Sequence, residues 1–193
     1  KKMKKFLTMV VALILLLSMS GCSSILKRKE AEYKAKVKQE LDSIPLEETG
    51  YKLVEVSGGD PETFPLYNYS VNINEHSYHF NYSHSENSCV FTIRVDEQPW
   101  EERKVSANLL EYNNIFKEYR DFEGCVYFDN QIFLIIKKAF LRGFFTQYSD
   151  YLPPVLFLYN YEESTIKYCG YFEEWFNYSP SRGDSRDFKI IKL

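Results

Sequence analysis

The sequence predicts an α+β protein: an antiparallel, aromatic-rich β-sheet of about seven strands, one packed helix and an N-terminal helical tether. Three observations predict it. Aromatic residues, which suit the half-buried surface of a sheet, make up 17% of the chain. Short apolar runs separated by turn residues recur from residue 49 onward, and two stretches carry apolar residues at helical spacing. The alternative arrangement of the same strands is a β-sandwich or half-barrel.

The first helical stretch covers residues 25–44. Tyr33, Val37, Leu41 and Ile44 fall on one stripe of a helix. Pro45 disfavours helical backbone at the residue before it and therefore ends the pattern. We expect this segment to be a stalk that lifts the domain and that can also pack on it.

The second helical stretch lies within residues 100–121. Pro99 stands at its start, and Glu101 and Glu102 occupy the first turn, where acids favour the positive end of a helix. Gly124 follows as a stop signal. The apolar residues that recur at helical spacing are Leu109, Tyr112, Phe116 and Tyr119.

Strand patterns fill most of the remaining chain. Asp129-Asn130 predicts a tight turn between two strands, and residues 133–136 are apolar on both faces, which predicts a central, covered strand. Pro153-Pro154 cannot lie inside a sheet. The predicted strands are residues 51–56, 66–73, 78–82, 89–95, 125–128, 132–137, 155–161, 165–172 and 188–191.

A short apolar segment stands near the N-terminus. Lys4 and Lys5 precede it, and the run from Phe6 to Leu17 contains twelve residues with Thr8 as its one polar member. A helix needs about 20 such residues to cross a hydrocarbon layer of ~30 Å. The segment instead fits the central region of a secretory signal.

The residues that follow, Met19-Ser20-Gly21-Cys22, resemble the lipobox of bacterial lipoproteins, with Met19 where leucine is usual. The resemblance implies that diacylglycerol is joined to the thiol of Cys22 and that the signal is cleaved after Gly21. Two acyl chains anchor a protein stably, at about 0.8 kcal/mol per buried CH₂. The implied location is the extracytoplasmic face of a bacterial cell membrane, with a lipid anchor.

The cleavage point and Pro45 divide the chain into three predicted parts. Residues 1–21 form the signal peptide, residues 22–45 the anchored tether and residues 46–193 a single β-rich domain. The net charge of the chain is −3. The domain is acidic, with 14 basic and 23 acidic residues, whereas residues 1–45 are net basic. Because phosphate binding requires a basic surface, we expect no nucleic-acid partner.

Three cysteines lie outside the signal: Cys89, Cys125 and Cys169. Their spacing matches no zinc or CxxC pattern. An exported protein could oxidise one pair to a disulfide, which would leave one thiol. Three buried free cysteines are the alternative.

Aromatic side chains are the candidate ligand-binding residues. Tyrosine is amphipathic, and strands with alternating polar positions can expose such rings to a sugar or peptide. The candidates are Tyr67, Tyr69, Tyr78, Tyr82 and Trp175.

The histidines His76, His79 and His84 are weak candidates for a metal site. On a strand, His76 and His84 share one face and His79 takes the other, whereas a metal needs three or four converging ligands. We therefore expect no metal and no cofactor. The nucleophile elbow, the P-loop, the dinucleotide fingerprint and the HExxH motif are absent from the sequence, so we assign no catalytic residue.

Three functional hypotheses follow. The first is a non-enzymatic surface lipoprotein that binds another envelope protein or serves as an accessory subunit. The second is a protein that binds a glycan or another small ligand. The third is an enzyme with an unrecognised site between His76 and Cys89, and we consider an enzyme less favoured than a binding protein.

Overall fold

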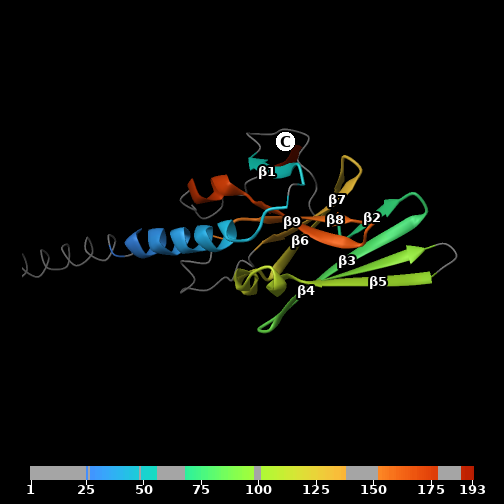
Figure 1. The fold of residues 1–193 in the computed structure, drawn as a ribbon, viewed down its shortest axis with the longest axis horizontal. Coiled ribbons are helices and arrows are strands. Elements are labelled where there is room, and N and C mark those ends of the chain that lie inside the picture. The colour runs from blue at the N-terminus through green and yellow to red at the C-terminus, as the bar shows by residue number, and fades with distance from the viewer. Residues whose placement is uncertain are drawn as a thin grey trace, which may run out of the picture. The chain divides into compact units, whose positions relative to one another are not determined.

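A computed structural model describes residues 25, 27–47, 49–55, 68–97, 101–137, 152–177 and 188–193 (Figure 1). The chain divides into two compact units, Lys1–Lys36 and Val37–Leu193. The predicted signal peptide with Gly21 and Cys22, the candidate residue Tyr67 and residues 138–151 lie outside the described residues.

The predicted N-terminal helix is confirmed. Helical backbone runs through residues 27–42, three residues short of Pro45. In the first unit, ion pairs four residues apart support the helix: Arg28 Nε lies 3.3 Å from Glu32 Oε1, and Lys34 Nζ lies 3.1 Å from Glu30 Oε1.

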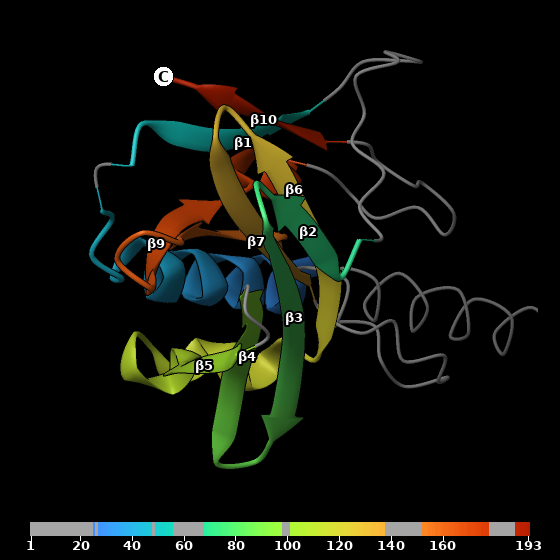
Figure 2. The same cartoon turned by 90° about the vertical axis from the view of Figure 1, so that its right-hand side faces the viewer.

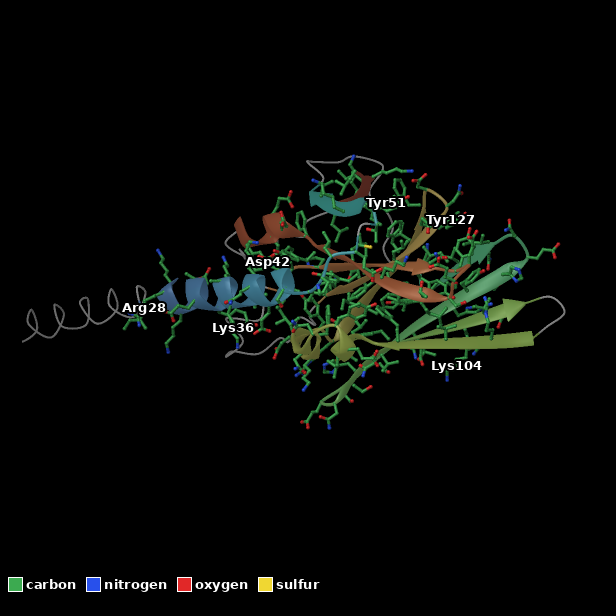
Figure 3. The ribbon with its side chains drawn as sticks, in the orientation of Figure 1. Arg28, Lys36, Asp42, Tyr51, Lys104 and Tyr127 are labelled. Atoms are coloured by element: carbon green, nitrogen blue, oxygen red, sulfur yellow. The ribbon has the colours of Figure 1, made fainter. Side chains whose placement is uncertain are left out.

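In the second unit, the end of this helix is part of the core. Val37, Leu41 and Ile44 are buried. The Lys38 ammonium donates to Asp42 Oδ2 at 2.7 Å and to the Tyr171 hydroxyl oxygen at 3.1 Å. The Tyr171 hydroxyl donates to Asp42 Oδ1 at 2.6 Å. We call these three residues the clasp; Asp42 is labelled in Figure 3.

The second unit is built from antiparallel sheets, as predicted. In the described residues, β1 pairs with β10, and the strand orders of the other two sheets are β2-β3-β4-β5 and β6-β7-β8-β9. The predicted number of about seven strands in one sheet is too low, since the described residues hold ten strands in three sheets. The strands are β1 (Tyr51–Glu55), β2 (Ser70–Ile73), β3 (His76–Ser85), β4 (Ser88–Glu97), β5 (Glu101–Asn108), β6 (Asp121–Phe128), β7 (Gln131–Lys137), β8 (Val155–Asn160), β9 (Thr165–Tyr171) and β10 (Phe188–Lys192).

The prediction of a helix within residues 100–121 is wrong. Residues Glu101–Asn108 form β5, in which Val105 pairs with Ile93 of β4. Two short 3₁₀ helices follow, η1 (Leu109–Glu111) and η2 (Asn114–Glu118). The backbone hydrogen bonds that residues 101–108 form with the edge of β4 outweigh the helix-start signal of Pro99, Glu101 and Glu102.

Asparagines explain why the apolar spacing produces short 3₁₀ turns. The side chains of Asn108 and Asn113 accept hydrogen bonds from the backbone N–H groups of Leu110 and Ile115. Such caps begin a new turn and interrupt a continuous helix. The predicted apolar stripe is nonetheless buried at Leu109, Phe116 and Tyr119. Gly124, the predicted stop, instead lies beside a bulge in β6 with φ 143°.

The strand β7 is the centre of the domain. Residues 132–136 are buried on both faces, as the sequence predicts for a covered strand. The turn before it is also confirmed: Asp129 and Asn130 have φ 49° and 59°. Left-handed backbone at both positions is typical of a type I′ hairpin turn.

One face of this sheet packs through an aromatic cluster around Phe157 of β8. The centroid of its ring lies 5.8 Å from that of Phe91, 5.5 Å from Phe116 and 5.7 Å from Tyr168. These rings come from β4, η2 and β9, so the cluster joins both four-stranded sheets. Figure 2 shows β2 beside β6, where the Cys125 N–H donates to the carbonyl oxygen of Asn68 at 2.8 Å.

The β1–β10 ribbon covers the other face. Tyr51 packs edge-on against Phe133, with centroids 4.9 Å apart. The Tyr51 hydroxyl and the Lys192 ammonium each donate to Asp129 Oδ2 at 2.7 Å. The central sheet is therefore covered on both faces. Antiparallel sheets with one α-helix in the described residues are compatible with the predicted α+β class.

Replacing Phe157 with alanine is expected to lower the free energy of unfolding by about 3–5 kcal/mol, because the substitution opens a cavity where the layers meet. Urea denaturation followed by circular dichroism measures the change. Tyr127→Ala is the control, since that ring is 42% exposed, and its expected effect is within about 0.5 kcal/mol. Equal effects of the two substitutions would contradict a central role for Phe157.

Replacing Asp42 with asparagine is expected to make unfolding less dependent on pH. Burial raises the pKa of Asp42, whereas hydrogen bonds from Lys38 and Tyr171 lower it. The hydrogen bonds together outweigh burial, so the pKa of Asp42 lies below the ordinary 3.8. A carboxyl group of this kind stabilises the fold above its unfolded pKa, and that stability is lost as the pH falls through its folded pKa.

The difference in unfolding free energy between wild type and Asp42→Asn should therefore be about 1 kcal/mol or less at pH 6, since the clasp is half exposed and screened. It should shrink toward pH 3. Urea titrations at both pH values measure it, and Glu86→Gln in the β3–β4 turn is the matched control. A difference that stays constant with pH would refute the role of the clasp.

Candidate functional site

A pocket of about 580 Å³ lies beside the central sheet. One wall is the segment that leads into β1, and the floor comes from β7, β8 and β9. Carboxylate, ammonium, amide and hydroxyl groups share this pocket with one aromatic ring and one leucine. The lining residues are Glu47, Thr49, Tyr51, Gln131, Leu158, Asn160 and Lys167.

Strand register explains why the floor residues converge. Leu158 is the register partner of Lys167 in β9 and of Phe133 in β7. Gln131 and Asn160 lie two residues from Phe133 and Leu158, and alternate residues of a strand share a face. Four side chains from three adjacent strands therefore point to the same side of the sheet.

Hydrogen bonds fix the orientation of the Asn160 amide. Its Oδ1 accepts from the backbone N–H groups of Glu162 and Glu163 at 3.0 and 3.1 Å. Because the oxygen already accepts two hydrogen bonds, the NH₂ group is the part of this side chain that is left to bind a ligand, as a donor. Lys167 Nζ lies 3.7 Å from Glu163 Oε2, a long contact between partly exposed groups.

The ring of Tyr51 lines the pocket, and its hydroxyl group fixes the position of the ring. Tyr51 donates to Asp129, and Lys192 Nζ lies 5.9 Å from the ring centroid. Burial and the hydrogen bond to Asp129 raise the pKa of Tyr51, so the ring stays neutral. The pocket therefore has a rigid aromatic wall beside polar groups.

The three cysteines are buried free thiols, the second of the two alternatives. Burial raises the pKa of Cys125 to about 12 and that of Cys169 to about 11. Burial also raises the pKa of Cys89. Because the thiolate is the nucleophilic form of cysteine, these groups are held in an unreactive state.

The region between His76 and Cys89 does place a histidine and a cysteine opposite each other. His84 and Cys89 are register partners across β3 and β4. However, the Cys89 thiol donates to the Phe116 carbonyl oxygen at 3.3 Å, and His84 Nε2 lies 2.7 Å from the Lys117 carbonyl oxygen. Both side chains attach η2 to the sheet, and a buried thiol with a raised pKa is a poor nucleophile.

The other two histidines have separate surroundings. His79 Nε2 lies 3.0 Å from Asp96 Oδ2. The His76 ring lies 6.4 Å from that of Tyr78, and its buried Nδ1 has no hydrogen-bond partner among the described residues. His76 and His84 stand at opposite ends of β3, about 27 Å apart at 3.4 Å per residue. Within the described ranges, no group of three His, Cys, Asp or Glu side chains could hold a metal ion.

The four candidate aromatic residues that the structure describes differ in exposure and surroundings. Tyr69 is 52% exposed, but Tyr78 is only 4% exposed and packs in the core. Tyr82 is half-buried and donates to the Tyr119 carbonyl oxygen at 2.9 Å. Trp175 packs against Phe172 at 6.4 Å. The expectation of an exposed ring is wrong for Tyr78, because its side of β3 faces the central sheet.

Sequence reasoning missed the pocket. Its residues come from separate parts of the chain, and polar residues such as Gln131 and Asn160 resemble ordinary strand ends. The one pocket residue with a visible sequence signal is Glu47, which belongs to the acidic pair Glu47-Glu48. That signal does not indicate a site, because such pairs usually occupy solvated turns.

Comparisons with protein-family models, curated proteins and solved structures found no match to this chain. Among the helices in the described part of the chain, none is long and apolar enough to cross a membrane.

Buried thiols with raised pKa values should not react in the folded protein. With Cys22→Ser, which leaves Cys89, Cys125 and Cys169, we expect no labelling by a thiol reagent at pH 8 and labelling of all three thiols in denaturant. An added Ser83→Cys substitution on the exposed side of β3 is the positive control. Rapid labelling of the folded protein without the added cysteine would disprove the burial of these groups.

Proposed function

We propose that this chain is a lipid-anchored extracytoplasmic protein of a bacterial envelope. Its β-rich domain would be a non-catalytic binding module that serves other envelope proteins as an accessory subunit. The anchor is motivated by the resemblance of residues 19–22 to a lipobox. The membrane contact would be made through diacylglycerol on Cys22.

The observation that carries the binding role is the chemistry of the described side chains. The groups best suited to catalysis have structural partners: Cys89 and His84 contact carbonyl oxygens of η2, and His79 contacts Asp96. The pocket, in contrast, presents polar groups with hydrogen-bonding capacity left over. Such an arrangement favours recognition over turnover.

Small-ligand binding is the second candidate function, and the pocket favours it. Its volume of about 580 Å³ falls in the range of about 300–1,000 Å³ that is typical of ligand sites. A binding protein of this kind could report a ligand to a partner or hold it near the membrane.

Cross-linking and affinity capture from native membranes test the proposal, with Cys22→Ser as the anchor-deficient variant. We expect the wild-type protein in the membrane fraction with a reproducible, identified envelope partner. We expect the variant in the soluble fraction without that partner, because the two acyl chains are missing.

A second substitution, Cys169→Ser, controls for the loss of a cysteine and should keep both properties. Two results would count against the proposal: membrane retention of the Cys22→Ser variant, or recovery of the wild-type domain alone under every cross-linking condition.

A further inference from the structure

We propose that the pocket between the β1 segment and the central sheet binds a small zwitterion, namely an α-amino acid or a dipeptide. This inference rests on the proposed binding role of the domain and names the chemical class of its ligand. It does not depend on the anchor at Cys22.

Two side chains of opposite charge line the pocket. Glu47 supplies a carboxylate and Lys167 an ammonium group, and both residues are half-buried. Within the described part of the chain, the Glu47 carboxylate has no ion-pair partner, and Lys167 has its long 3.7 Å contact with Glu163. A ligand with an ammonium and a carboxylate group would satisfy both side chains at once.

Neutral hydrogen-bonding groups stand beside the two charged side chains in the pocket. The oriented Asn160 NH₂ group comes from β8, next to Lys167 on β9, so the two can share a carboxylate. The Gln131 amide and the Thr49 hydroxyl also line the pocket and can bind the peptide group of a dipeptide. The small exposed parts of Leu158 and Tyr51, 8% and 9%, leave room for apolar contact with a small side chain only.

Other classes of ligand fit the pocket less well. A sugar is usually bound against an open aromatic face, but Tyr51 is only 9% exposed and already packs on Phe133. A dianion such as phosphate would meet the Glu47 carboxylate, and like charges at close range are unfavourable. One positive and one negative group favour a ligand with the same two charges.

Isothermal titration calorimetry on the full-length lipidated protein in detergent tests the assignment. The probes are L-alanine, D-alanine and L-alanyl-L-alanine, with N-acetylalanine and alaninamide as analogues that lack one charge. We expect saturable binding of at least one zwitterion, and at least tenfold weaker binding of both analogues.

Matched variants assign each charge. Glu47→Gln should weaken the zwitterion and alaninamide but leave N-acetylalanine unchanged, because the acetylated probe has no ammonium group. Lys167→Gln should weaken the zwitterion and N-acetylalanine but leave alaninamide unchanged. Lys104→Gln on β5, whose exposed side chain is labelled in Figure 3, should change nothing.

The assignment is overturned if no probe binds, if glucose or inorganic phosphate binds more tightly than the zwitterions, or if neither pocket substitution changes the affinity. Unchanged thermal unfolding of the variants excludes misfolding as the cause of lost binding. If ligand binding fails while the envelope partner is still captured, only the pocket assignment falls. If the partner and the membrane anchor fail while ligand binding persists, only the proposed envelope function falls.

Discussion

The burial of β7 on both faces determines how the other sheets of the domain are arranged. A strand that is apolar on both sides must be covered twice, because each exposed face would leave large side chains in water. The Phe157 cluster joins one face to the β2–β5 sheet, and the β1–β10 ribbon covers the other. This ribbon brings the first and last strands of the domain together, and both are attached to the turn before β7, because Tyr51 and Lys192 each donate a hydrogen bond to Asp129.

Local signals were sufficient to predict the elements whose structure is decided locally. The helix before Pro45, the Asp129-Asn130 turn and the buried strand at residues 133–136 were all predicted, since each depends on neighbouring residues in the sequence. The stretch 100–121 was mispredicted because its conformation depends on a distant partner, the edge of β4. The asparagines at 108 and 113 carried the correcting signal, but only as caps whose role becomes clear in the folded chain.

The candidate site was harder to predict for the same physical reason. Aromatic residues such as Tyr78 and Tyr82 alternate with polar ones, and a pattern with period two does not say which side of a strand faces a second sheet. The pocket requires the register of three strands and the path of the chain before β1. Neither is available from composition or spacing, so residues such as Asn160 carried no signal.

The core and the pocket are two consequences of one arrangement. Complete burial makes the thiols of Cys89 and Cys125 unreactive and fixes the aromatic rings, which suits a stable scaffold more than a catalytic centre. Tyr51 belongs to both regions, because its ring packs on the core while also lining the pocket. A ligand there would meet groups that folding has already positioned, and pre-organised groups lose little entropy on binding. The same double coverage that stabilises β7 thus supplies a rigid site at the edge of its sheet.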